Sequence, residues 1–118
     1  MGKKKNRNKR NGLEKEFELI LQELDINYEF HFWYHKKEFD FILLDYNILI
    51  EVDGDFYHCN RKIGYKPEYS IQRKNIRNDR VKNRLVKKYK EFKLVRFWEN
   101  DIKNKRDDVI SKLRKIIS

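Results

Sequence analysis

The sequence predicts an α/β fold, of the α+β type with a mixed sheet, from three observations. Hydrophobic periodicity switches between helical and strand spacing in the order α, β, β, β, α, β, α. The helix expected between the third and fourth strands is long enough for a crossover connection, which allows those strands to pair in parallel. The length of 118 residues fits one compact domain. We therefore expect a single domain at 13–118, preceded by a disordered basic tail at 1–12.

The first half of the domain is expected to contain one helix and then three antiparallel strands. Apolar residues recur at helical spacing between Leu13 and Leu24, which predicts an amphipathic helix with its apolar stripe toward the core. Aromatic residues alternate with polar ones at 28–34, and the segments 39–44 and 48–53 are rich in β-forming residues. Because only short turns separate these three runs, we expect consecutive antiparallel strands.

The second half begins with a polar loop at 60–67. A long helix is predicted from about residue 68 to residue 90, with its apolar positions concentrated in the second half at Val81, Leu85, Val86 and Tyr89. Only that half is expected to dock firmly on the sheet. Residues 92–98 are predicted to form the fourth strand, and the apolar positions at 109–117 predict a terminal helix.

Charge is distributed unevenly along a chain whose formal net charge is +10. The basic segment, 61–90, has twelve basic and two acidic side chains, whereas the acidic segment, 38–60, has six acidic side chains and no basic one. Basic surface attracts polyphosphate through counterion release, which predicts a nucleic-acid partner; a solvated lysine-rich face is the alternative. Six carboxylates would repel phosphate unless some of them bind a hard divalent cation. The two segments together predict a metal-dependent enzyme that acts on nucleic acid.

Three carboxylates of the acidic segment form the candidate metal site. Glu51 and Asp53 are two residues apart at the end of a strand, so both point to the same face, where two like charges are costly unless a cation neutralises them. Asp40 joins this face if the register pairs odd with even numbers, for example Asp40 opposite Asp53 around a turn at 46–47. A three-residue turn without a bulge would place Asp40 on the other face. The alternative is an ordinary acidic pair beside a glycine turn.

The acidic segment also carries a family resemblance. It reads Asp-Phe at 40–41, Ile-Glu-Val-Asp-Gly at 50–54 and Tyr-His at 57–58. This arrangement resembles the very-short-patch-repair endonuclease-like (Vsr-like) branch of the PD-(D/E)xK nucleases. The resemblance covers about residues 13–102 and includes three further segments, which are Leu13-Glu14 with Phe17 and Leu21, Asp79 with Lys82, and Val-Arg-Phe-Trp-Glu at 95–99. It implies a restriction endonuclease-like core and an enzyme similar to free-standing homing or phage-type endonucleases.

The resemblance implies that Asp40 and Glu51 are the principal metal ligands and that Asp53 is a third ligand or orients the attacking water. Magnesium is the expected ion, with manganese as a substitute, because all-oxygen ligation suits a hard cation. The wider superfamily has a lysine two residues after the glutamate, where this chain has Asp53. Lys82 is the expected source of the missing positive charge.

Two further side chains are candidates for the same catalytic site. His58 resembles the histidine of the repair-type relatives, and we expect it to donate to phosphate or to act as general base or acid. A structural histidine is the alternative. Glu14 is expected to complete the carboxylate cluster from the first helix, with Glu16 as the other choice.

Nucleic-acid contacts are expected from the tail, the loop and the long helix. Four polar positions of that helix follow one another at spacings of three, four and three, namely Gln72, Asn75, Asp79 and Lys82. They form a polar stripe that could face the site; a solvated helix face is the alternative. Tyr57, Tyr65 and Tyr69 could stack on bases, although aromatic residues beside a sheet are commonly core residues. The predicted contact residues are Lys3, Lys4, Lys5, Arg61, Lys62, Gln72, Arg73, Lys74, Asn75, Arg77 and Asp79.

The composition argues against several classes of protein. The lone cysteine, Cys59, excludes an internal disulfide, and no structural zinc site is expected, which disfavours a mismatch-nicking repair enzyme. The sequence contains no apolar run long enough for a membrane span and no signal peptide, so we expect a cytoplasmic protein of a bacterial cell, nucleoid-associated or produced during phage infection.

These observations lead to the hypothesis of a magnesium-dependent DNA endonuclease that hydrolyses phosphodiester bonds, either at specific sites or generally. RNA as substrate and pairing into a homodimer are left open. The alternative is a nucleic-acid-binding module that has the nuclease fold without catalysis, which the missing motif lysine favours and the retained carboxylates disfavour. A basic assembly protein of the ribosomal type would explain the lysine excess but not the acidic segment.

Overall fold

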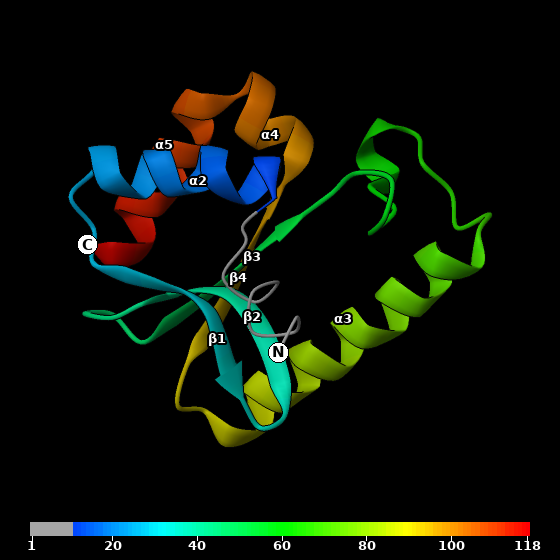
Figure 1. Ribbon diagram of the computed structural model, residues 1–118, viewed down its shortest axis with the longest axis horizontal. Helices are drawn as coiled ribbons and strands as arrows, with labels where there is room; N and C mark the ends of the chain where they lie inside the picture. Colours follow the sequence, from blue (N-terminus) through cyan, green and yellow to red (C-terminus); the bar gives the residue numbers. More distant parts are fainter. Residues whose placement is uncertain (1–10) are drawn as a thin grey trace, which may run out of the picture.

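A four-stranded mixed sheet in the order β1-β2-β3-β4 forms the centre of the protein (Figure 1). The computed structural model describes residues 11–118. The first three strands, β1 (Tyr28–Tyr34), β2 (Lys37–Leu43) and β3 (Ile48–Asp53), follow one another antiparallel. Strand β4 (Lys93–Trp98) pairs with β3 in parallel. The predicted fold class, the order of elements and the parallel pairing of the third and fourth strands are confirmed.

The helices lie on opposite sides of this sheet (Figure 1). Helices α2 (Gly12–Glu23), α4 (Glu99–Asn104) and α5 (Arg106–Ile117) cover one face, and α3 (Ser70–Tyr89) crosses the other. The expected terminal helix is α5; the short α4 before it was not predicted. A 3₁₀ turn, η1 (Arg61–Ile63), lies within the predicted loop. None of the helices in residues 11–118 combines the length and apolarity that crossing a membrane requires.

Helix α2 begins with a capping box, which also fixes the direction of Glu14. The Asn11 side chain accepts a hydrogen bond from the Glu14 N–H at 2.7 Å, and the Glu14 carboxylate accepts one from the Asn11 N–H at 3.0 Å. One turn later, Phe17 packs between Phe41 and Phe97, with ring centroids 5.5 and 5.1 Å apart. Glu14 therefore lies on the buried side of the helix, close to the sheet.

The two faces of the sheet have separate apolar clusters. The larger cluster lies under α2, α4 and α5 and includes Phe17, Phe41, Phe97 and Leu113. The smaller one lies under α3 and consists of Phe39, Ile42, Leu49 and Val86. Fully burying one such side chain contributes about 1.5–3 kcal/mol. Most of the apolar stabilisation therefore comes from the α2 side.

Helix α3 docks differently from the prediction. Of the apolar residues in its second half, Val86 is buried and Leu85 is partly buried, but Val81 and Tyr89 are 38% and 41% exposed. Its first half extends past the sheet toward the loop that follows β3 (Figure 1). Gln72 in this half is buried and bonded to that loop. The expectation that only the second half docks firmly is therefore wrong, because polar contacts also fix the first half.

The register between β2 and β3 decides where Asp40 lies. Phe41 is paired with Ile50 and Leu43 with Ile48, so odd numbers face even numbers as the site hypothesis requires. The ladder would bring Asp40 level with Glu51, not with Asp53, so the suggested pairing is wrong by two residues. The parity is the same, and Asp40 and Glu51 share a face.

The hairpin formed by β1 and β2 is kinked at His31, so that its aromatic residues pack on opposite faces of the sheet before and after the kink. His31 has φ of +55°, a left-handed conformation that is uncommon outside glycine. Before it, Phe30 packs against the larger apolar cluster; after it, Phe32 packs against the smaller one. Across the ladder, Phe41 and Phe39 are divided in the same way. The kink therefore lies beside Asp40, where the hairpin changes direction.

Candidate active site

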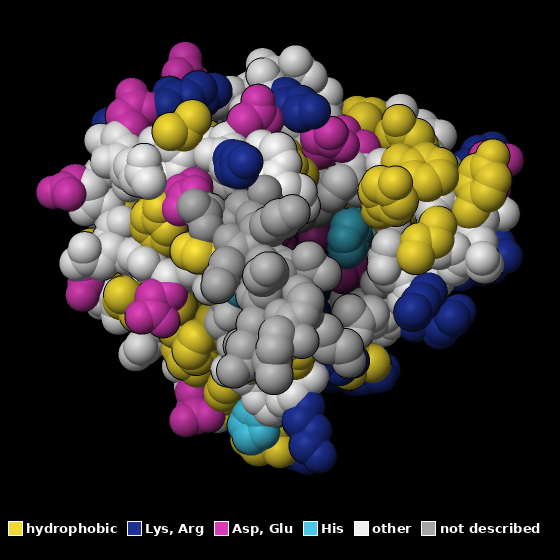
Figure 2. Space-filling model, in the orientation of Figure 1, with side chains coloured by type: hydrophobic (Ala, Val, Ile, Leu, Met, Phe, Trp, Pro, Cys, Tyr) yellow, Lys and Arg dark blue, Asp and Glu magenta, His cyan; other side chains and the backbone are white. Residues whose placement is uncertain are grey.

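A cleft with a volume of 530 Å³ opens between the start of α2, the first half of β2, the end of β3, and α3. Histidine and acidic side chains gather in a recess of the surface (Figure 2). The predicted residues that line the cleft are Glu14, Asp40, Glu51, Tyr57, His58, Asn75 and Lys82. A larger, mainly apolar groove of 650 Å³ lies elsewhere, between the end of α3 and β4, and no carboxylate lines it. The carboxylates and His58 therefore make the first cleft the candidate active site.

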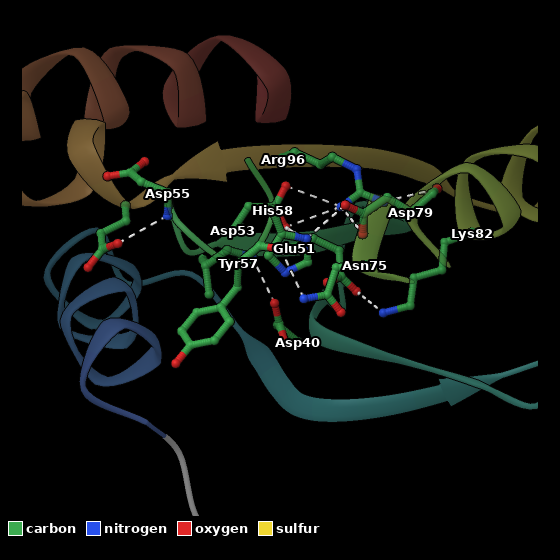
Figure 3. Close-up of polar contacts among 12 residues, drawn as sticks. Asp40, Glu51, Asp53, Asp55, Tyr57, His58, Asn75, Asp79, Lys82 and Arg96 are labelled. Atoms are coloured by element: carbon green, nitrogen blue, oxygen red, sulfur yellow. Dashed lines mark hydrogen bonds and ion pairs between the residues drawn. The ribbon is translucent and has the colours of Figure 1, made fainter. Parts of the chain in front are cut away.

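Asp40 occupies the floor of this cleft. Its carboxylate accepts a hydrogen bond from the backbone N–H of Val52 at 2.8 Å, which fixes it against β3 (Figure 3). Burial of the carboxyl group, the charge of Glu51 and a hydrogen bond with Glu14 raise the pKa of Asp40 well above its usual range, and the Val52 N–H opposes this only in part. Carboxyl groups from α2, β2 and β3 thus converge at a point where extra negative charge is unfavourable.

Glu51 forms a buried ion pair with Lys82. The Lys82 Nζ lies 2.8 Å from Glu51 Oε1 and 5.0 Å from the centre of the Phe39 ring. Burial raises the pKa of Glu51, although the nearby Lys82 ammonium lowers it in part. Helix α3 thus delivers a lysine to the glutamate of the candidate site, in agreement with the placement expected for Lys82.

Asp53 belongs to a second polar group, which also contains His58, Asp79 and Arg96 (Figure 3). The Arg96 Nη1 lies 3.2 Å from both carboxylate oxygens of Asp53 and 3.3 Å from Asp79 Oδ1. His58 Nδ1 is 2.7 Å from Asp79 Oδ2 and 3.8 Å from Asp53 Oδ1. Ligand atoms of Asp53, His58 and Asp79 lie within 4.8 Å of one another, a spacing that could hold a metal ion. In this conformation the Arg96 guanidinium neutralises both carboxylates.

Burial and neighbouring charges shift the pKa values of Asp53 and His58. Burial raises the pKa of Asp53, against the lowering effects of Arg96 and His58. Burial alone would lower the pKa of His58, but the hydrogen bond to Asp79 and the charge of Asp53 outweigh it and raise the pKa. His58 is therefore a histidine whose protonation and orientation both depend on Asp79.

Comparison with known proteins agrees with this architecture. The protein is similar to the solved catalytic domain of the homing endonuclease I-Bth0305I, with a TM-score of 0.66 and 22% sequence identity over 91% of this chain and 94% of that chain. The chain has the fold of a homing endonuclease catalytic domain. No family model and no curated protein matches the sequence. At this identity the similarity establishes the fold alone.

The loop that carries His58 is fastened to α3 by Gln72. The Gln72 side chain is 1% exposed. Its oxygen accepts hydrogen bonds from the N–H groups of Glu68 and Tyr69, and its nitrogen donates to the carbonyl of Phe56, each at 2.9 Å. Gln72 therefore lies inside the protein, not on the surface that the sequence predicted to contact nucleic acid. Its hydrogen bonds hold the loop against the first turn of α3.

The other residues of the predicted polar stripe have different surroundings. Asn75 lines the cleft and donates to the carbonyl of Tyr57 at 3.0 Å. Asp79 is bonded to His58 and Arg96, so its carboxylate is already used within the protein. The stripe does face the site, as predicted, but two of its members, Gln72 and Asp79, organise the loop and the histidine.

Arg96 and His31 are among the residues beside the site that the sequence analysis did not predict. Arg96 lies in the segment that carries the family resemblance, so a signal for it existed. His31 had none: its Nε2 lies 3.4 Å from Glu14 Oε1 and its Nδ1 lies 3.9 Å from Glu38 Oε2, and both contacts depend on the kink in β1. A left-handed residue within a strand leaves no mark in hydrophobic periodicity.

The predicted basic contacts within the described residues lie on η1 and on the first half of α3, and none of them lines the cleft. Five of them are exposed and stay predictions, namely Arg61, Lys62, Arg73, Lys74 and Arg77. Lys3, Lys4 and Lys5 lie outside the residues that the structure describes. Tyr57 and Tyr69 are each 57% exposed and Tyr65 is 38% exposed, so these aromatic rings lie at the surface and not in the core.

Proposed function

We propose that the protein is a metal-dependent DNA endonuclease of the Vsr-like PD-(D/E)xK type, which hydrolyses phosphodiester bonds in the cleft. The observation that carries this proposal is the convergence of Glu14, Asp40 and Glu51 from three elements, beside Lys82 and the His58 and Asp79 pair. The similarity in fold to a homing endonuclease domain supports it. So does the net charge of +10, which favours a polyanionic substrate.

The donor groups fit a hard divalent cation such as Mg²⁺, with Mn²⁺ as a substitute. Carboxylate oxygens are the ligands such ions prefer, and the raised pKa of Asp40 indicates a place where a neighbouring positive charge is missing. Asp40 and Glu51 would hold the ion, with Asp53 or Glu14 as a further ligand. Such an ion supplies charge neutralisation at the phosphate and lowers the pKa of bound water.

The side chains of the protein would carry out the remaining steps. If Glu51 bound the divalent ion, its ion pair with Lys82 would be released. Lys82 could then direct its ammonium group to a phosphate oxygen and offset the charge that develops there. His58 in its neutral form can accept a proton from the attacking water, because Asp79 holds the ring in place. Arg96 keeps Asp79 and Asp53 in position and is therefore a positioning residue.

The test is cleavage of supercoiled plasmid and a labelled duplex with Mg²⁺, with Mn²⁺ and with EDTA. We expect metal-dependent cutting that Asp40→Asn and Glu51→Gln each reduce by about 10²–10⁴-fold, the usual range for one essential catalytic group. The matched control is Glu29→Gln, which removes an exposed carboxylate from β1 and should leave the rate unchanged. Asp40→Asn should fold at least as stably as the native chain near neutral pH, because burial penalises the carboxylate and not the amide.

A different result would support the binding module. If no metal produces cleavage of either DNA, while salt-dependent DNA binding is strong and unaffected by the two substitutions, the carboxylates have no catalytic role. Cleavage of RNA in place of DNA would keep the chemistry and change the substrate.

A further inference from the structure

Helix α3 carries a row of five cations on the side away from the cleft. Arg73, Arg77, Arg80, Arg84 and Lys87 follow one another at spacings of four, three, four and three, so they share one face, and all five are exposed. Lys and Arg side chains are visible along the outer edge of the molecule over α3 (Figure 2). We call these five residues the outer stripe.

The outer stripe and the cleft use opposite faces of the same helix. Asn75, Asn78 and Lys82 point into the cleft. At 3.6 residues per turn, Arg80 and Arg84 are rotated by about 160° from Lys82 around the helix axis. A straight stretch of duplex that fills the cleft therefore cannot also cover the outer stripe.

Contacts within the protein do not explain this arrangement. The only acidic residue of α3 is Asp79, and it is bonded to His58 and Arg96 on another side. Among residues 11–118, no carboxylate forms an ion pair with a member of the outer stripe; Arg73 alone donates to a backbone carbonyl, that of Pro67. Like charges three and four residues apart repel, and Arg73 lies near the helix N-terminus, where cations are unfavourable. The outer stripe therefore destabilises an isolated helix.

We propose that the outer stripe binds the phosphate backbone of a second segment of duplex DNA, distinct from the segment that is cut. The stripe runs straight for about 20 Å at 1.5 Å per residue, which is the length of about six base pairs. Guanidinium groups suit phosphate oxygens because they present paired donors. The inference takes DNA as the ligand from the proposed function, but it does not depend on cleavage.

The experiment compares two triple variants that lose the same charge. The test variant is Arg77→Gln with Arg80→Gln and Arg84→Gln; the control changes exposed residues at the other end of the chain, Lys105→Gln with Arg114→Gln and Lys115→Gln. Binding of a labelled duplex is measured without metal over 50–200 mM salt. We expect the slope of log K against log salt to fall by about 2–3 in the test variant only, at about 0.9 per lost phosphate contact. Bead-bound duplex should capture a second labelled duplex through the native protein and not through the test variant.

Each outcome separates the two proposals. An unchanged slope, or a change equal to that of the control, would show that the outer stripe does not bind DNA, even if cleavage is observed. A reduced slope without capture of a second duplex by the native protein would show that the stripe binds the same duplex as the cleft and not a second one. If the native protein cuts no DNA but the slope and the capture both depend on the outer stripe, this inference stands and the nuclease does not.

Discussion

The two faces of the central sheet differ in what they bury. Under α2, α4 and α5, aromatic and aliphatic side chains form a continuous core, with Phe17 between Phe41 and Phe97. Under α3, a smaller apolar cluster lies beside a group of charged side chains from β2, β3, the loop after β3, α3 and β4, namely Asp40, Glu51, Asp53, His58, Asp79, Lys82 and Arg96. We refer to these as the apolar face and the polar face.

In this small protein the residues that stabilise the fold and the residues of the candidate site lie largely on different faces of the sheet. Burying a charge costs free energy, and a buried ion pair commonly stabilises a fold no more than apolar residues of the same volume would. The pKa values of Asp40, Glu51 and Asp53 are all raised, so keeping these three carboxyl groups ionised near neutral pH opposes folding. The larger apolar cluster of the apolar face offsets this cost, and the three carboxylates are better explained by chemistry than by stability.

The largest effect is expected from a truncation in the apolar face. Phe17→Ala should lower the free energy of unfolding by about 3–5 kcal/mol, because it removes contacts with two other rings and leaves a cavity. Val86→Ala, in the apolar cluster of the polar face, should cost roughly 2 kcal/mol, at about 0.8 kcal/mol per methylene plus a small cavity. Urea unfolding measures both, with Leu19→Ala as the exposed control on α2. If Phe17→Ala and Val86→Ala lowered the free energy of unfolding equally, the two faces would not differ in their contribution to stability.

The next largest effect concerns the ion pair of the polar face. Lys82→Met keeps the side-chain volume but leaves Glu51 without its cation, and should lower the free energy of unfolding by about 2–3 kcal/mol, less than a fully isolated charge because Glu51 can take up a proton. Adding Glu51→Gln should restore stability to within about 1 kcal/mol of the native chain. Urea unfolding without metal tests this, with Lys74→Met as the exposed control on α3. A double variant as unstable as the single one would mean that the pair itself stabilises the fold.

A smaller effect is expected where the polar face holds the loop that carries His58. Gln72→Ala removes three hydrogen bonds to backbone groups and should destabilise the protein by about 1–3 kcal/mol. Cleavage should fall by about 10–100-fold while DNA affinity stays within a factor of three, since Gln72 is buried and supports His58 only through the loop. Ile71→Ala, next to it and 42% exposed, is the control. A loss of affinity larger than the loss of rate would show that this loop binds DNA directly.

The smallest effect is a change in pH dependence. The pKa of His58 is raised, so its neutral, proton-accepting form appears only as the pH rises through that raised value. Asp79→Asn removes the hydrogen bond to a carboxylate and should move the acidic limb of the pH–rate profile to lower pH. The same raised pKa stabilises the fold at pH values below the ordinary histidine range, and this contribution is lost as the pH rises through the raised pKa. An acidic limb that stays in place would remove His58 as the base; Asp107→Asn on α5 is the control.

Much of the fold followed from the sequence, because periodicity reports which side of an element is apolar. The alternation at 28–34 and the helical spacing from Leu13 predicted the elements that form β1 and α2. The spacing of Glu51 and Asp53 predicted that both leave β3 on one face, since side chains two apart in a strand always do. The long helix before β4 predicted the parallel pairing, because a parallel neighbour needs a crossover.

Periodicity and residue spacing were thus enough to predict the order of elements, the mixed sheet and the concentration of carboxylates on β2 and β3. The partners of these side chains were not predictable in the same way: Lys82 pairs with Glu51, Arg96 pairs with Asp53, and Gln72 hydrogen-bonds the loop that carries His58. The physical reason is range. Local periodicity fixes the direction of a side chain relative to its own element, whereas its partner depends on register, on the kink at His31 and on the docking of α3, which are set by packing across the whole domain.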